Sequence, residues 1–145
     1  MDEFAIDVSD QPADADLIDR IGAGMDETVP NGVAGYAPSP LTITLSEGDV
    51  IQGALVGASV WDWLYVNLLW VARRERGRGL GVRLMQAAEA EAEQRGLTGI
   101  WVSTYSFQAP TFYEKLGFRT FGRIDDFPSG HVRYFLQKRL DPASI

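Results

Sequence analysis

Trp63-Leu-Tyr-Val-Asn-Leu-Leu-Trp-Val71 and the run that follows it, Arg73-Arg-Glu-Arg-Gly-Arg-Gly-Leu-Gly81, decide the fold. The first stretch is rich in β-branched and aromatic residues, which is typical of a buried central strand. From Leu80 to Arg95 apolar and small residues recur at helical spacing, and Gly96 stands where a C-terminal cap belongs. The glycine and arginine run therefore lies between a buried strand and the start of a helix.

This position predicts a site for a small anion. The N–H groups at a helix start are unpaired and lie at the positive end of the helix dipole, and glycines let the backbone approach a diphosphate closely. Residues 73–83 hold five arginines and one acid, a local positive charge that suits a small anion better than a nucleic acid. A Walker loop needs Gly-Lys-Ser/Thr, which is absent, and a dinucleotide fingerprint needs glycine where Val82 stands.

The rest of the chain predicts alternating strands and helices in one domain, residues 1–145. Before the central strand we expect a strand at 4–8, a helix at 12–28, a loop at 30–40, and a hairpin of 41–45 with 50–56. After the long helix we expect a strand at 99–104, a helix at 109–116, and two final strands at 118–123 and 131–138.

Composition excludes several classes of protein. The sequence has no cysteine and one histidine, His131, which removes disulfides, thiolate nucleophiles and Cys/His zinc sites, so we expect no metal. The N-terminus has no basic or apolar leader, and the uncharged, apolar-rich stretch 50–61 is too short to span a bilayer. We therefore expect a cytoplasmic protein with no membrane and no nucleic acid partner.

A second motif, Ser106-Phe-Gln-Ala-Pro-Thr-Phe-Tyr-Glu-Lys-Leu-Gly-Phe118, follows the strand at 99–104. Ala109 and Tyr113 are four residues apart and share a helix face, so the small residue leaves room for a ligand beside the phenol. Gly117 is positioned to end the helix. The alternative is that Tyr113 is a core aromatic whose hydroxyl is satisfied internally.

Together the two motifs resemble the GNAT superfamily of N-acetyltransferases. Its Arg/Gln-x-x-Gly-x-Gly/Ala motif, which holds the pyrophosphate of coenzyme A, is matched by Arg76, Gly79 and Gly81. Its later motif is matched from Ala109 to Phe118, although Ser106 stands where many members carry asparagine. The resemblance implies an α/β (α+β) fold with a mixed, mostly antiparallel central sheet, helices on both faces, and a splay near Val71 that admits pantetheine.

The resemblance also implies acetyl-CoA as cosubstrate, a primary amine as acceptor, and direct transfer between them. The residues implied in acetyl-CoA binding are Leu69, Trp70, Val71, Arg76, Gly77, Arg78, Gly79, Leu80, Gly81, Val82, Ser106, Ala109 and Tyr113.

The catalytic roles follow from the same resemblance. Tyr113 would act as general acid on the leaving thiolate, and backbone N–H groups from Leu69 to Val71 would polarise the acetyl carbonyl. The base that takes the amine proton is open, because the strand at 63–71 has no carboxylate. The candidate bases are a water chain, Asp62, His131, Asp125 and Asp126. Tyr65 and a further catalytic candidate, Asn67, share the more polar face of the strand instead.

Two other functions stay open. A non-catalytic acyl-CoA-binding domain would keep the glycine loop without turnover, and a nucleotide-binding module would bind ATP in preference to coenzyme A. The acceptor itself is not identified by the sequence, and a homodimer is also left open.

Overall fold

The computed structural model describes residues 3–140 and divides the chain into two compact units, one ending at Tyr36 and one beginning at Ala37. The first unit contains α1 (Ala15–Asp26), whose start is capped by Asp14: the carboxylate accepts a hydrogen bond from the Leu17 N–H at 2.8 Å. The predicted helix in 12–28 is confirmed.

The predicted strand at 4–8 is wrong, because residues 3–10 form no regular structure. Phe4, Ile6 and Val8 are 85%, 90% and 93% exposed. Alternation of apolar residues produces a strand only where a neighbouring strand supplies hydrogen bonds. No strand of the described chain pairs with this segment.

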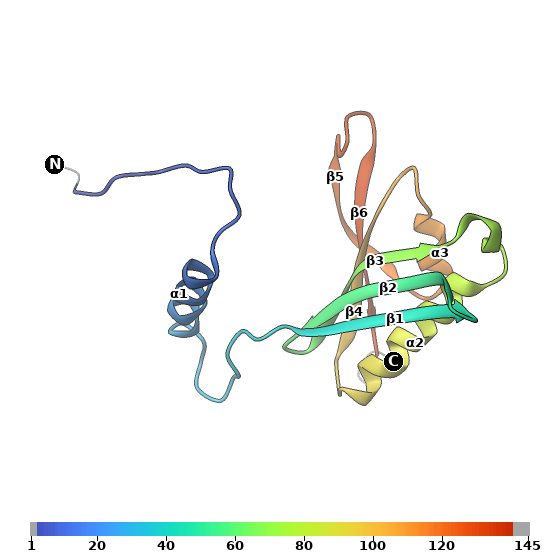
Figure 1. Cartoon of the computed structure of the whole chain (residues 1–145), viewed down its shortest axis with the longest axis horizontal. Helices are drawn as coiled ribbons and strands as arrows, with labels where there is room; N and C mark the ends of the chain where they lie inside the picture. Colours follow the sequence, from blue (N-terminus) through green and yellow to red (C-terminus); the bar gives the residue numbers. More distant parts are fainter. Residues whose placement is uncertain (1–2, 141–145) are drawn as a thin grey trace. The chain divides into compact units, whose positions relative to one another are not determined.

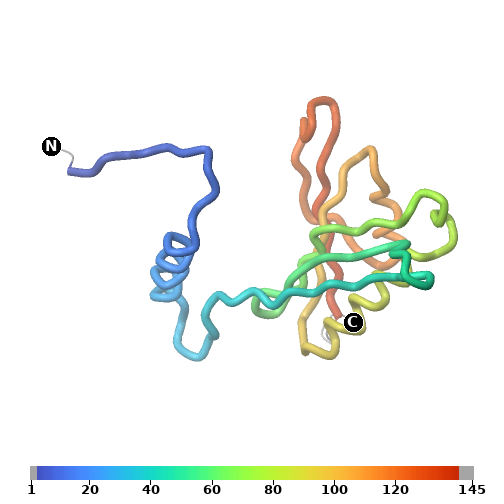
Figure 2. Tube along the Cα trace, in the orientation of Figure 1, coloured from blue at the N-terminus to red at the C-terminus, as the bar shows by residue number. Residues whose placement is uncertain are grey.

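The second unit is built on a six-stranded sheet with the order β1-β2-β3-β4-β6-β5 (Figures 1 and 2). Only β3 and β4 pair in parallel; the other neighbours are antiparallel. The mixed, mostly antiparallel sheet and every strand predicted after residue 40 are confirmed. The elements are β1 (Ser39–Glu47), β2 (Val50–Val60), β3 (Trp63–Val71), the short 3-10 helix η1 (Arg73–Glu75), α2 (Leu80–Gln94), β4 (Gly99–Tyr105), α3 (Pro110–Lys115), β5 (Arg119–Asp125) and β6 (Val132–Arg139).

Helices α2 and α3 lie on the same face of this sheet. The connections β3-α2-β4 and β4-α3-β5 both advance in one direction along the sheet, and right-handed crossovers then place both helices on one side. The side chains agree, since the Phe112 ring of α3 lies against Gly81 of α2. The core between helices and sheet includes Leu55, Leu64, Val66, Leu84, Met85, Ala88, Ala92, Ile100, Val102, Tyr113, Phe118 and Leu136.

The opposite face of the sheet carries aromatic side chains. An open apolar hollow on it is lined by Trp63, Trp101, Phe121, Phe135 and Gln137. The structure does not confirm the expected helices on both faces of the sheet, because α2 and α3 lie on the same face. That expectation stays a prediction.

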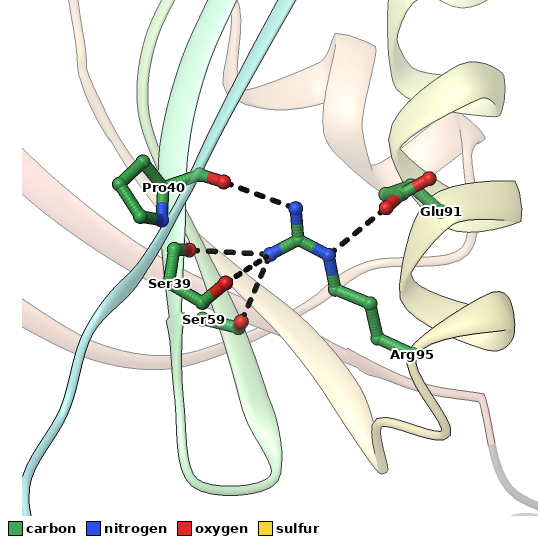
Figure 3. A network of polar contacts seen from close by, with 5 residues as sticks. All are labelled: Ser39, Pro40, Ser59, Glu91 and Arg95. Carbon is green, nitrogen blue, oxygen red and sulfur yellow. Dashed lines mark hydrogen bonds and ion pairs between the residues drawn. The ribbon is translucent and has the colours of Figure 1, made fainter.

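Arg95, just after α2, ties that helix to β1 and β2 (Figure 3). Its guanidinium donates to the backbone oxygens of Ser39 and Pro40 at 3.1 and 3.0 Å and to the Ser59 hydroxyl at 3.0 Å. Its Nε lies 3.0 Å from a Glu91 carboxylate oxygen. The C-terminal end of α2 is thereby fixed, and its N-terminal end lies beside the carboxyl end of β3.

Candidate functional site

Strands β3 and β4 separate halfway along β3. Their parallel ladder pairs Trp63–Val66 with Gly99–Val102, whereas β2 stays paired with β3 as far as Val71. The β2 register shifts between Val56 and Gly57, which leaves Asn67 as a bulged residue on β3. The second half of β3 therefore has one free edge, which faces a gap in the sheet.

The backbone of Leu69 and Val71 faces this gap. The Ala72 N–H donates to the Gln52 carbonyl of β2 at 2.8 Å, and successive residues of a strand direct their polar groups to opposite sides. The backbone N–H and C=O groups of Leu69 and Val71 therefore point away from β2. The Val71 carbonyl accepts a hydrogen bond from Arg76 Nε at 3.2 Å. This geometry permits the predicted backbone role, which stays a prediction.

The glycine loop turns the chain from β3 into α2. Gly77 and Gly79 have φ of +82° and +77°, a left-handed conformation in which a β-carbon is strained. Gly79 is the N-cap of α2, and the described structure gives this helix start no capping side chain. The first N–H groups of the helix are therefore free for an anionic ligand.

The arginines of this loop are used in two different ways. Arg78 forms an ion pair with Glu75, which is only 8% exposed, and lines a separate depression together with Leu80 and Arg83. Arg76 instead lines the cavity at the gap. The sequence predicted both Arg76 and Arg78 as ligands of the same anion.

A cavity of about 670 Å³ extends from the gap between the strands to the glycine loop. Its walls come from the end of β3, the loop, the end of β4 and α3. Eight of the predicted acetyl-CoA residues belong to them. The lining residues are Leu69, Trp70, Val71, Arg76, Gly77, Gly81, Thr104, Phe107, Gln108, Ala109, Phe112 and Tyr113.

A second, more polar cavity of about 280 Å³ adjoins the first. It is lined by Tyr65, Val66, Asn67, Leu68, Leu69, Ser103, Tyr105, Gln108, Tyr113 and Arg133. The two cavities share Leu69, Gln108 and Tyr113. A molecule in one cavity can therefore meet a molecule in the other at these three residues.

Tyr113 is held rigidly at this junction. Its ring packs edge-on against Phe112 and Phe118, with centroids 5.0 and 5.8 Å away, and its side chain is 8% exposed. Burial raises the pKa of Tyr113 from 10.0 to about 12, because desolvation disfavours the phenolate. The hydroxyl therefore keeps its proton at neutral pH and can donate a hydrogen bond.

The four side chains predicted as candidate bases lie outside the lining of both cavities, whereas the candidate Asn67 lines the second cavity. Asp62 lies in the turn before β3, at the opposite end of that strand from Val71. His131 Nδ1 is 3.4 Å from the Ser106 hydroxyl, which accepts a hydrogen bond from the Val132 N–H. Asp125 is paired with Arg123, and Asp126 accepts a hydrogen bond from the Gly130 N–H.

Three further residues predicted to bind the cofactor do not line the larger cavity. Gly79 caps α2 and Val82 lies in its first turn, while Ser106 follows β4 and bonds the backbone of Val132. Sequence reasoning missed Gln108 and Arg133, although both line the second cavity. Gln108 belongs to the second motif and could have been noticed there, whereas Arg133 becomes relevant only through the pairing of β6 with β4.

Two findings concern what the described part of the chain lacks. Residues 3–140 contain no group of three or more His, Cys, Asp or Glu side chains arranged to hold a metal ion. None of the helices in the same range has the length and apolar character needed to cross a bilayer.

Known proteins resemble this chain in sequence and in structure. Residues 13–118 match the model of the Acetyltransferase (GNAT) family. Blasticidin-S acetyltransferase of Streptomyces morookaense is 45% identical over 100 residues, which are 68% of this chain and 74% of that protein. An acetyltransferase structure from Bacillus cereus ATCC 14579 has a TM-score of 0.79 at 26% identity and covers 92% of this chain and 98% of its own.

A third likeness concerns the fold alone. An aminoglycoside 6'-N-acetyltransferase complexed with coenzyme A has a TM-score of 0.64 at 18% identity, covering 72% of this chain and 75% of its own.

Proposed function

The chain belongs to the acetyltransferase (GNAT) family, and on this basis we propose that it transfers an acetyl group from acetyl-CoA to a primary amine. The observation that carries the proposal is the junction of two cavities at Leu69, Gln108 and Tyr113. The larger cavity would hold acetyl-CoA, and the smaller one would hold the acceptor. Contact between the two molecules at the junction favours direct transfer without an acetylated enzyme.

The larger cavity suits coenzyme A. The free N–H groups at the start of α2 and the Arg76 guanidinium supply positive charge for a pyrophosphate. Gly77 and Gly81 have no side chain, so the backbone of the loop stays accessible to the ligand. The free edge of β3 at Leu69 and Val71 offers amide and carbonyl groups to a pantetheine arm. Ala109 contributes a small side chain beside Tyr113.

The reaction then needs few groups from the protein. The amine nitrogen forms a bond to the acetyl carbon, the bond from that carbon to sulfur breaks, and the thiolate takes up a proton. In this proposal the Leu69 and Val71 N–H groups stabilise the oxyanion, and the Tyr113 hydroxyl protonates the thiolate. Burial in the same site would raise the basicity of the thiolate as well as the pKa of Tyr113, so its two effects on this proton transfer oppose each other.

The amine proton has a less specific route. Neither cavity is lined by a carboxylate among the described residues, and Tyr65 and Asn67 are the polar groups on β3. We propose that the acceptor loses its proton to water in the second cavity, and that water returns a proton to Tyr113, which lines the same cavity. Asp62 and His131 lie outside both linings and have no place in this scheme.

The missing carboxylate also supports a second candidate function, a domain that binds acyl-CoA without turning it over. The two candidates differ in one measurement. Purified protein is given acetyl-CoA and a panel of amines that includes blasticidin S, chosen because the relative named after it is 45% identical over 100 residues. Free thiol and acetylated product are then measured, the latter by mass spectrometry.

Acetylated product with equal thiol release supports the transferase. Coenzyme A binding by calorimetry with no product from any amine supports the binding domain instead. A rise in the melting temperature of the protein with ATP but not with coenzyme A would overturn both candidates in favour of a nucleotide-binding module.

A further inference from the structure

Arg133 of β6 lines the second cavity from the side of β4. Its Nε and Nη2 donate to the Ser103 hydroxyl at 3.0 and 2.6 Å. Its guanidinium carbon lies 5.6, 5.1 and 5.1 Å from the ring centroids of Tyr105, Phe127 and Phe135. The aromatic rings and the hydroxyl fix the orientation of the side chain, because each contact restrains the same planar group.

The charge of Arg133 has no anionic partner among residues 3–140, where four ion pairs involve other cations. A guanidinium carries five N–H donors, and Ser103 uses only Nε and Nη2. Nη1 and the second N–H of Nη2 are thereby left for a ligand. The rings also exclude water from their side, which strengthens attraction between this cation and an anion.

We infer that the acceptor amine carries a carboxylate, which Arg133 binds at the end of the second cavity remote from acetyl-CoA. The inference rests on the proposed function and specifies its substrate class. A guanidinium binds a carboxylate through two parallel hydrogen bonds and so orients the molecule as well as holding it. The carboxylate would anchor one end of the acceptor while its amine reaches Tyr113 and Leu69.

The cation is placed for the acceptor and not for coenzyme A. Arg76 lines the larger cavity and Arg133 lines only the smaller one. The remaining walls of the smaller cavity present neutral groups, including Tyr65, Asn67 and Gln108. Among the described residues the only charged group in that lining is therefore the arginine, which favours an anionic substituent there.

The test uses amino acids and their methyl esters as matched acceptors. A series of ω-amino acids of increasing length, together with several α-amino acids, is compared with the corresponding esters, which keep the amine and lose the negative charge. We expect kcat/KM for the best acid to exceed that of its ester by at least about tenfold, the range of a charge-assisted hydrogen bond. The difference should lie mainly in KM, since the carboxylate is bound equally before and during transfer.

Two substitutions at Arg133 separate charge from shape. Arg133→Gln should reduce the preference for the acid to less than about threefold, because kcat/KM should fall far more for the acid than for the ester. Arg133→Lys should keep part of the preference, because the charge remains and the planar fork is lost. Arg123→Gln is the matched control: Arg123 is 56% exposed on the neighbouring strand β5 and pairs with Asp125, so its loss should leave the preference unchanged.

A wild-type protein that uses acid and ester equally well overturns the inference, as does an acid preference that survives in Arg133→Gln. A separate titration measures binding of the same acids and esters to the protein loaded with coenzyme A. If no amine is acetylated, the proposed function fails, but the titration still tests the anion site. Binding of the acid that Arg133→Gln abolishes supports this site. A lack of acid binding to the wild type overturns it.

Discussion

The Phe112 ring of α3 lies so close to Gly81 of α2 that a β-carbon at position 81 would stand 3.2 Å from the ring. Both residues line the larger cavity. Gly81→Val should therefore push the ring into the space proposed for coenzyme A and weaken its binding by at least about tenfold, roughly 1.4 kcal/mol. Calorimetric titration with coenzyme A measures this change directly.

Gly22→Val is a suitable control for that experiment. Gly22 is also helical, in α1, and a β-carbon there would meet nothing within 4 Å. It should carry the same cost of a β-branched residue in a helix and leave coenzyme A affinity unchanged. Unaltered affinity in folded Gly81→Val would contradict the assignment of the cavity.

The left-handed glycine at position 79 provides a second test of the loop. Gly79 has φ of +77°, and Gly48, in the turn between β1 and β2, has φ of +60°. Valine at either position strains the backbone by about 1–2 kcal/mol and should lower the melting temperature of the free protein. Only Gly79→Val should lose the stabilisation that coenzyme A gives the wild type.

ATP at the same concentration should protect the wild type much less than coenzyme A. Equal coenzyme A protection of both glycine variants would show that this loop does not hold the ligand.

Local sequence was enough to predict most elements and half of the site. Strand β3 has the predicted ends, because its apolar residues are bounded by Asp62 and by the arginine run. The glycine run could be predicted as the start of a helix because it lies between this strand and the apolar residues at helical spacing after Leu80. The family, recognised from two motifs, is confirmed by the match over residues 13–118.

Contacts between distant segments could not be predicted in this way. Arg133 enters the second cavity because it pairs with Tyr105 across two strands, a register that one sequence does not contain. Arg78 does not line the same cavity as Arg76, because it forms an ion pair with the buried Glu75 and lines a separate depression. Residues 4–8 alternate like a strand, yet alternation cannot supply the neighbouring strand that they would need.

The network around Arg95 predicts a loss of stability without a loss of chemistry. Arg95→Met keeps the length of the side chain and removes its hydrogen bonds to Ser39, Pro40 and Ser59. Because Ser59 is 6% exposed, its hydroxyl would be left unsatisfied, and we expect a loss of about 1–3 kcal/mol in urea unfolding. Arg119→Met, on the exposed surface of β5, should change stability by less than about 0.5 kcal/mol.

If Arg95→Met also lowered coenzyme A affinity at a temperature where it is folded, the network would act on the site as well as on stability.

The buried phenol predicts a loss of stability in alkaline solution. The pKa of Tyr113 is about 12 in the folded protein against 10.0 ordinarily, so its contribution is fully present below pH 10 and is lost as the pH rises through 12. The maximal loss is on the order of 3 kcal/mol for this difference in pKa. Urea unfolding at about pH 8 and about pH 11 should show a smaller alkaline loss in Tyr113→Phe than in the wild type.

Phe118→Leu controls for lost packing, because Phe118 is buried against the Tyr113 ring and does not ionise. It should lower stability equally at both pH values. An alkaline loss that is the same in Tyr113→Phe and the wild type would assign the effect to other groups.

The Tyr113 hydroxyl also gives the sharpest test of catalysis. Tyr113→Phe keeps the ring packed against Phe112 and Phe118 and removes only the proton donor at the junction of the cavities. We expect kcat to fall about 10²-fold while coenzyme A affinity stays within about threefold, because the hydroxyl acts on the leaving thiolate and not on ground-state binding. Tyr134→Phe, on β6 and outside both cavity linings, should leave both quantities unchanged. A fall in kcat together with affinity would indicate lost packing, and an unchanged kcat in a folded variant would remove Tyr113 from the mechanism.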